Sequence, residues 1–110
     1  MPISTRWLFV VRMDVTPEKE DLFNEVYDDE HIPYLMEVPG VLSVTRAKSE
    51  AFAMAIAGGL EQKPQASPAY LAIYEIESPE VLKSEAWATA VEKGRWGPDV
   101  RPYTTNRSHV

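Results

Sequence analysis

The sequence predicts an α+β fold in which a four-stranded antiparallel sheet carries two helices on one face. Two observations lead to this class. Four segments rich in β-branched and aromatic residues have the composition of strands, and two segments with apolar residues at helical spacing separate them. In chain order the elements are strand, helix, strand, strand, helix and strand. A chain of 110 residues forms them as a single domain, residues 1–110.

The first strand is predicted over residues 7–15, which read WLFVVRMDV, and both of its alternating sets of side chains are largely apolar. A strand that is apolar on both faces is covered on both, so we expect helices on one side and a second subunit on the other. Thr16-Pro17-Glu18 then predicts a helix start, with a threonine N-cap and proline at the first helical position. Pro33 is expected to stop or kink this helix near Ile32.

The later elements follow from turn signals between apolar segments. Pro39-Gly40 predicts a turn before a second strand over residues 41–48, and residues 70–77 predict a third strand. Ser78-Pro79-Glu80 repeats the helix-start pattern, and apolar residues at helical spacing follow it. Residues 101–110 predict a last, more polar strand.

The segment between the second and third strands is harder to assign. Residues 51–60 read AFAMAIAGGL, and their periodicity allows either an extension of the second strand or a small apolar helix. Residues 62–68 predict a polar loop, which at this length is usually functional or mobile. The resulting order is the ferredoxin-like βαββαβ arrangement, whose sheet has one open face. Because the first strand is apolar on both sides, we expect a homodimer to cover this face.

Composition and charge exclude several classes of partner. Seventeen acidic and eleven basic residues give a net charge of −6, which argues against nucleic acid and against anionic membrane surfaces. With no cysteine and two histidines, neither a thiolate metal site nor an all-protein zinc site is expected. The sequence shows no targeting signal and no apolar run long enough to span a membrane, so we expect a cytoplasmic protein.

Two short motifs carry a resemblance to a known family. One is Tyr27-Asp28-Asp29-Glu30-His31-Ile32-Pro33 at the end of the first helix, and the other is Val38-Pro39-Gly40-Val41 before the second strand. On these motifs, and on the order of elements over about residues 6–107, the chain resembles the dimeric α/β-barrel superfamily and, within it, the EthD-like proteins. Residues 51–67 depart from the family pattern because they are longer and more apolar, which leaves the shape of any pocket open.

The resemblance implies a fold and a range of activities. Its ferredoxin-like subunits pair through their sheets as a dimeric α/β barrel. The superfamily includes cofactor-free oxygenases of aromatic polyketides, muconolactone-type isomerases, polyketide cyclases and haem enzymes, so the fold does not choose one reaction. Haem ligation by His31 has this analogy as its only support, and we predict no cofactor.

His31 is the leading candidate for chemistry. Histidine titrates near neutral pH and acts as a general acid or base. Tyr27 lies one helical turn before it and Asp28 three residues before it, so either would share its face and orient the ring. Asp28, Asp29 and Glu30 also bring negative charge to the negative end of a helix, a conflict more common at functional sites. The alternative is that His31 caps the helix end and the acids form a solvated face.

Aromatic and basic residues supply candidates for the walls of a ligand pocket. Small-molecule sites are usually apolar with a few polar groups, and from the aromatic residues we select Trp7, Tyr70 and Trp96. Most of the other aromatic residues are expected in the core or in a dimer interface. Arg46 and Arg12 lie mid-strand, where an arginine would bind a carboxylate or an enolate oxygen. The preferred interpretation is an interface ion pair with Glu75 or Asp14.

Three further interpretations concern other residues. A general base of the tautomerase type would require Pro2 to open the first strand, but three residues intervene before the apolar run. A metal site over residues 28–31 is disfavoured because adjacent helical residues point in different directions, and no metal is predicted. His109 lies near the end of the last strand and is interpreted as a surface residue.

The sequence therefore predicts a homodimer with one small hydrophobic pocket per subunit, between the sheet and the helices, with His31 at its polar end. As an enzyme it would carry out cofactor-free proton transfer on a small aromatic or lactone-like molecule. His31 would move the proton, Tyr27 or Asp28 would orient it, and an arginine or tyrosine would stabilise the developing negative charge. Isomerisation, cyclisation, dehydration and cofactor-free oxygenation all begin in this way. The alternative is a non-catalytic ligand-binding or structural dimer module.

Overall fold

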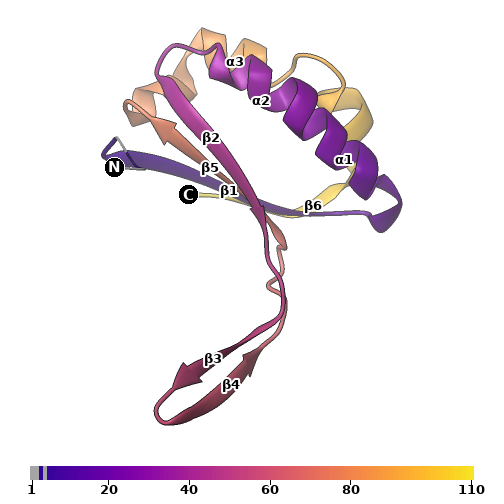
Figure 1. Cartoon of the computed structure of the whole chain (residues 1–110). Coiled ribbons are helices and arrows are strands. Elements are labelled where there is room, and N and C mark those ends of the chain that lie inside the picture. The colour runs from indigo at the N-terminus through magenta and orange to yellow at the C-terminus, as the bar shows by residue number, and fades with distance from the viewer. Residues whose placement is uncertain (1–2, 4) are drawn as a thin grey trace.

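The computed structural model describes residue 3 and residues 5–110, so the interpretation of Pro2 lies outside the described residues. These residues form a four-stranded antiparallel sheet and a separate two-stranded hairpin (Figure 1). The sheet has the order β2-β5-β1-β6, and its strands are β1 (Trp7–Val15), β2 (Val41–Lys48), β5 (Tyr70–Ile76) and β6 (Thr104–His109). The predicted α+β class with a four-stranded antiparallel sheet is therefore confirmed.

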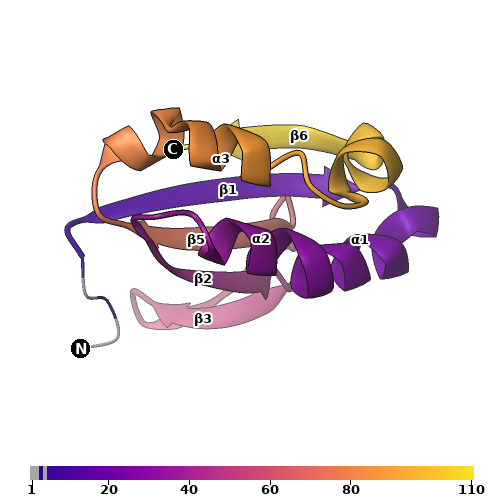
Figure 2. The same cartoon turned by 90° about the horizontal axis from the view of Figure 1, so that it is seen from above.

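The helices cover one face of this sheet and leave the other face open (Figures 1 and 2). In β5 every second residue is buried beneath them, because strand side chains alternate between the two faces. The buried set is Tyr70, Ala72, Tyr74 and Ile76. The open face carries the half-buried Val10, Leu71 and Ile73 and the exposed Leu8. This apolar group lies on the two central strands, and the same face also carries the charged Arg12 and Glu75.

The first helical segment contains a wide π turn. A 3-10 turn η1 (Pro17–Lys19) leads into α1 (Glu20–Val26), the π turn η2 (Tyr27–His31) and α2 (Ile32–Met36). In a regular α-helix Pro33 would leave a carbonyl without its donor and would clash with it. In the π turn the Ile32 N–H donates instead to the Tyr27 carbonyl five residues earlier. Pro33 therefore widens the helix locally, and the helix continues past Ile32.

The starts of the helices differ from the prediction in two places. Thr16 makes no side-chain capping bond, because its hydroxyl donates to the Tyr103 carbonyl, 3.1 Å away. Ser78 does cap its turn, but a second cap at Ser84 divides that segment into η3 (Pro79–Lys83) and α3 (Glu85–Ala90). A second π turn, η4 (Trp96–Val100), and the 3-10 turn η5 (Arg101–Tyr103) precede β6. In the described residues no helix combines the length and the apolar character needed to cross a membrane.

Residues 52–63 form an arm that projects away from the sheet on the side opposite the helices (Figure 1). The arm is a hairpin of β3 (Phe52–Ile56) and β4 (Gly59–Lys63). Its two-residue turn has positive φ angles at Ala57 (51°) and Gly58 (84°), as a type I′ turn requires. The apolar helix considered for this segment is therefore wrong, and β3 pairs with β4 instead of extending β2. The predicted loop begins only after Lys63.

Candidate functional site

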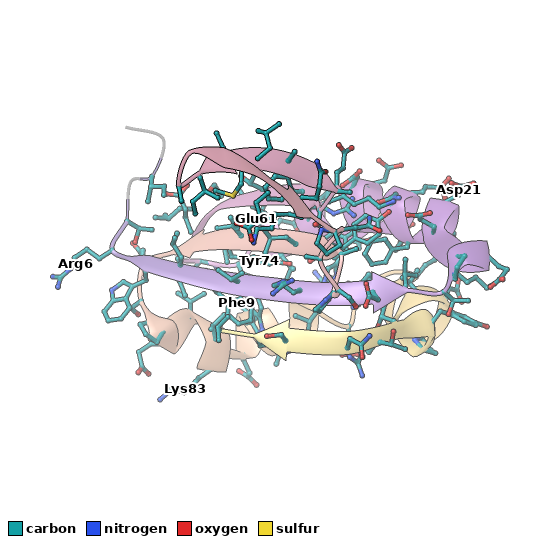
Figure 3. The ribbon with its side chains drawn as sticks, turned by 90° about the horizontal axis from the view of Figure 1, so that it is seen from below. Arg6, Phe9, Asp21, Glu61, Tyr74 and Lys83 are labelled. Atoms are coloured by element: carbon teal, nitrogen blue, oxygen red, sulfur yellow. The ribbon has the colours of Figure 1, made fainter. Side chains whose placement is uncertain are left out.

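A cavity of about 390 Å³ lies between the helix-covered face of the sheet and the helical segments. This volume is within the range of small-molecule sites. Residues of β1, β5 and β6 form its floor, and residues of η2, α2, α3 and η4 form its roof. Phe9 and Tyr74 lie directly opposite each other on the floor, with ring centroids 5.6 Å apart (Figure 3). The polar lining residues include Tyr27, His31, Arg101 and Arg107.

His31 ends the π turn and lines the cavity, where it is 5% exposed. Its ring stacks on the Trp96 indole with centroids 4.4 Å apart and planes 19° apart, and Tyr27 meets it edge-on at 5.0 Å. The Nδ1 atom of His31 is buried and has no hydrogen-bond partner among the described residues. Most buried polar atoms in proteins are hydrogen-bonded, so this unpaired nitrogen marks His31 as a candidate functional residue.

The protonation state of His31 follows from its surroundings. The pKa of His31 is lowered from 6.5 to about 4, mainly because the imidazolium form loses its hydration on burial. The guanidinium of Arg101 contributes to this decrease, and the carboxylate of Glu92 opposes it. His31 is therefore neutral at pH 7 and keeps the lone pair that a general base needs.

Tyr27 and Tyr74 connect the π turn to the centre of the sheet. Their hydroxyl groups lie 2.8 Å apart, and each residue is 2% exposed. Burial raises the pKa of both phenols, so both stay protonated at neutral pH. Two hydroxyl groups that share one hydrogen bond leave one O–H to donate elsewhere. The pair can therefore donate a hydrogen bond to an oxygen atom of a ligand.

Basic side chains also line the cavity. Arg101 donates hydrogen bonds of 2.7 and 2.9 Å to the two carboxylate oxygens of Glu92. Arg107, on β6, makes no hydrogen bond or ion pair with any described residue. His109 stacks on Phe9 with ring centroids 5.9 Å apart. The described lining residues include two arginines and two histidines but no aspartate or glutamate.

Arg46 belongs to a separate polar cluster on the helix side of β2. Its guanidinium donates hydrogen bonds of 2.7 Å to Asp28 and of 2.7 Å to Asn24. It also lies 4.6 Å from the centre of the Tyr27 ring. Tyr70 borders the same cluster, 5.7 Å from the guanidinium. The arginine therefore ties β2 to the first helical segment by hydrogen bonds and by cation–π contact.

The predicted partners of Arg46 are wrong. Arg46 pairs with Ala72 in the sheet and points to the helix side, whereas Glu75 pairs with Leu8 and lies on the open face. Asp14 instead accepts hydrogen bonds from Ser67, Ala69 and Asn106. A strand has two faces, and the sequence does not show which partner shares the face of Arg46.

Of the residues predicted for the site, the structure brings His31, Tyr27 and Trp96 together at the cavity. Asp28 does not orient His31, because its side chain is 57% exposed and pairs with Arg46. Trp7 does not line the cavity, because it opens β1 and is 44% exposed. Arg46 and Tyr70 lie in the separate polar cluster.

The acidic residues of the π turn also have partners that the sequence did not show. Glu30 accepts hydrogen bonds from the backbone N–H and the side chain of Arg95, at 2.9 and 2.6 Å. Because the helix continues to Met36, these acids do not lie at its negative end. The predicted conflict with the helix dipole is therefore absent.

Sequence reasoning missed the residues that the C-terminal segment brings to the cavity. Arg101, Arg107 and His109 line it because β6 pairs with β1. His109 is exposed, as its interpretation as a surface residue predicts, but it also stacks on Phe9 at the cavity. One signal was available in the sequence: Arg107 and His109 are two residues apart in the predicted last strand, so both would lie on the same face of the sheet. In the described part of the chain, no group of three His, Cys, Asp or Glu side chains is placed to hold a metal ion.

Comparisons with known proteins bear on the fold. No family model matches the sequence, and no curated protein matches it. Among solved structures, the chain is similar to the crystal structure of an ethyl tert-butyl ether d (EthD) family protein from Bacillus halodurans. The TM-score is 0.57 at 11% sequence identity, and the match covers 94% of this chain and 95% of the other. At this identity the similarity shows that the fold is EthD-like, and no activity is inferred from it.

Proposed function

We propose that the cavity binds a small hydrophobic or aromatic molecule and that His31 acts on it as a general acid–base group. The observation that carries this proposal is the buried imidazole of His31, which lines the cavity and whose Nδ1 atom has no hydrogen-bond partner among the described residues. The aromatic rings of Trp96, Tyr27 and Phe9 supply flat apolar walls. Such walls suit a planar apolar molecule with one or two polar atoms.

The proposed step is removal of a proton from a C–H group next to a carbonyl group. The proton moves to the neutral imidazole of His31, and the electron pair of the broken bond becomes an enolate. The remaining O–H of the Tyr27–Tyr74 pair donates a hydrogen bond to the enolate oxygen. Because the pKa of His31 is about 4, its imidazolium form returns the proton readily. This suits isomerisation, in which the proton is delivered to another carbon.

Hydrogen–deuterium exchange tests this step without knowledge of the product. The protein is incubated in D₂O with a panel of small aromatic ketones and lactones, and the loss of C–H signals is followed by proton NMR. We expect exchange with wild type, and a loss of at least 100-fold with His31→Gln. Asp28→Asn is the matched control, because Asp28 lies away from the cavity. Equal exchange rates for wild type and His31→Gln would contradict the proposal.

The second candidate function is a ligand-binding module without catalysis. The same cavity supports it, since a buried imidazole nitrogen also accepts or donates a hydrogen bond in simple binding. It predicts that ligands shift the NMR signals of His31 without any C–H exchange. If cavity variants change only the stability of the fold, the chain is a structural dimer module.

We also propose that the subunit is ferredoxin-like and that two chains pair through their open sheet faces as a dimeric α/β barrel. The half-buried Val10, Leu71 and Ile73 on that face support this pairing, because exposed apolar patches usually mark interfaces. Ile73→Glu would place a charge in the interface and dissociate the dimer. Light scattering measures the mass of both proteins, and a stable wild-type monomer at micromolar concentration would contradict the pairing.

A further inference from the structure

Arg107 is a charged group in the cavity wall that has no counter-ion among the described residues. The other arginine in the wall, Arg101, is held by both carboxylate oxygens of Glu92. Arg107 makes no ion pair or hydrogen bond with any residue that the structure describes. Acidic residues outnumber basic residues by seventeen to eleven in this chain, so counter-ions are abundant elsewhere. The cavity wall is therefore positively charged in a protein whose net charge is −6.

The other lining residues add no negative charge to this wall. The titratable groups that line the cavity are the guanidinium groups of Arg101 and Arg107, the imidazoles of His31 and His109, and the neutral phenols of Tyr27 and Tyr74. No carboxylate among the described residues lines it, and Glu92 reaches it only through Arg101. Arginine binds carboxylates through a planar pair of N–H donors. An anion would therefore meet donors in this wall and no like charge.

We propose that the ligand of this cavity is a small aromatic or hydrophobic carboxylate whose charged end pairs with Arg107. This inference rests on the proposed function, since it names the ligand class of the same cavity. Arg107 is exposed, whereas His31 is 5% exposed. The carboxylate would stay near the solvent at Arg107, and the apolar body would lie deeper against the aromatic rings. This arrangement avoids burying the charge, which is costly without a partner.

Matched pairs of acids and amides test the ligand class. The probes are benzoate, phenylacetate, cinnamate and 1-naphthoate, each with its neutral primary amide, and calorimetry gives the dissociation constants. For at least one pair we expect wild type to bind the acid at least tenfold more tightly than the amide. Arg107→Met should remove this preference and leave the affinity for the amide unchanged. Arg6→Met is the control, because it removes the same charge at a residue that points away from the molecule at the start of β1 (Figure 3).

A second readout is the pKa of His31, followed by NMR with and without each probe. A bound carboxylate should raise this pKa, because a negative charge favours the imidazolium form, whereas the amide should not. Equal affinities of acid and amide for wild type would overturn the inference and leave the cavity proposal standing. If no probe of either kind shifts the signals of His31 or Trp96, the proposed function and this inference both fail.

The arm, residues 52–63, is a second feature that a single chain leaves without a partner. Phe52, Met54 and Ile56 lie on one face of the hairpin, next to the ion pair of Glu61 and Lys63 on β4, and are 54%, 39% and 50% exposed. An isolated two-stranded hairpin is at best marginally stable in water. In the described residues, the apolar face of this hairpin therefore lacks the contacts that would keep it folded.

The dimensions of the chain indicate how much surface a partner would cover. The radius of gyration is 15.8 Å, compared with about 13 Å for a compact domain of this length. The accessible surface is 6955 Å², compared with about 6,100 Å² for a compact monomer of this mass. The excess is about 800 Å², which is the area that each partner buries in an interface of standard size.

We infer that the apolar face of the arm packs against a second copy of this chain. The arm projects on the open side of the sheet, and its residue Glu61 lies in front of the sheet when the molecule is viewed from that side (Figures 1 and 3). A copy docked on the open face would therefore also meet the arm. The contact would be reciprocal in a twofold dimer, with each arm reaching its partner.

The test compares the two faces of the arm. The double variant Phe52→Ser with Ile56→Ser removes apolar groups from one face, and Leu60→Ser removes one from the other, since Leu60 pairs with Ala55. Sedimentation should show the dimer dissociation constant rise at least tenfold in the double variant and stay unchanged in Leu60→Ser. A double variant that dimerises like wild type, or a wild-type monomer, would overturn the inference. Dissociation by Ile73→Glu alone would leave the open-face dimer and exclude the arm.

Discussion

The hydroxyl groups of Tyr27 and Tyr74 lie 2.8 Å apart and join the π turn of the first helical segment to the central strand β5. Both side chains are almost fully buried, and their rings border the cavity that His31 also lines. The fold and the candidate site therefore depend on the same contact. A change in this hydrogen bond should affect both stability and ligand binding.

Removal of either hydroxyl group should destabilise the protein. Tyr27→Phe and Tyr74→Phe should each lower the free energy of unfolding by about 1–2 kcal/mol, because each leaves the other hydroxyl group buried without this partner. The double variant should lose less than the sum, since no orphaned hydroxyl group remains. Urea denaturation measures all three changes. Tyr34→Phe is the control, because Tyr34 is half-buried and its hydroxyl group makes no hydrogen bond with the described residues, and additive losses would contradict the prediction.

The depressed pKa of His31 should appear in the pH dependence of stability. Between pH 6.5 and about 4 the unfolded chain binds a proton at this histidine that the folded chain does not. The contribution of His31 to stability is complete above pH 6.5, falls as the pH decreases, and the total loss is about 3 kcal/mol. His31→Phe removes this titration. The unfolding free energy of wild type should therefore fall relative to that of the variant as the pH falls from 6.5 to 4.

Carboxylates with lowered pKa values also contribute to the pH dependence of stability. Hydrogen bonds to Lys48 and Tyr70 lower the pKa of Glu20, and hydrogen bonds to Arg95 lower that of Glu30. The stability that they contribute is also lost at low pH, but it is common to both proteins. Parallel curves for wild type and His31→Phe would show that His31 titrates normally in the folded chain.

The turn at Gly40 should not tolerate a side chain. Gly40 has a φ of +94°, and a Cβ atom there would lie closer to Val81 Cγ2 than packed atoms approach. Gly40→Ala should cost about 1–3 kcal/mol through backbone strain and the displaced Val81 side chain. Gly59→Ala is the control, because nothing lies within 4 Å of its Cβ position and its φ is not positive. Thermal unfolding compares the two, and equal melting temperatures would contradict the assignment.

Arg46 should stabilise the fold more through its contacts with aromatic rings and its paired N–H donors than through its ion pair with Asp28. Arg46→Lys should cost about 1 kcal/mol, because an ammonium group cannot reach Asp28 and Asn24 together or stack in the same way on Tyr27. Asp28→Asn should cost less than about 0.5 kcal/mol, since the carboxylate is 57% exposed. Chemical denaturation measures both, and a larger loss for Asp28→Asn would reverse this interpretation.

Local patterns predicted the elements of the sheet well, because alternation and turn residues act over a few positions. β1 matches its predicted residues 7–15, and β2 matches its predicted residues 41–48. The arm was not predicted, since a short apolar run does not reveal whether it forms a helix, extends a strand or pairs with its neighbour. The π turn was not predicted either. Its hydrogen bond depends on how Pro33 is accommodated inside a longer helix.

The sequence by itself determined the α+β class, the strands of the sheet and His31 as a candidate, because these follow from residue type and short-range periodicity. Only the tertiary structure decided which groups surround His31. It replaced Asp28 and Trp7 with Tyr74, Arg101 and Arg107, which come from strands and turns far along the chain. The physical reason is that burial and the partners of a charge depend on strand pairing, which brings together residues that no local pattern connects.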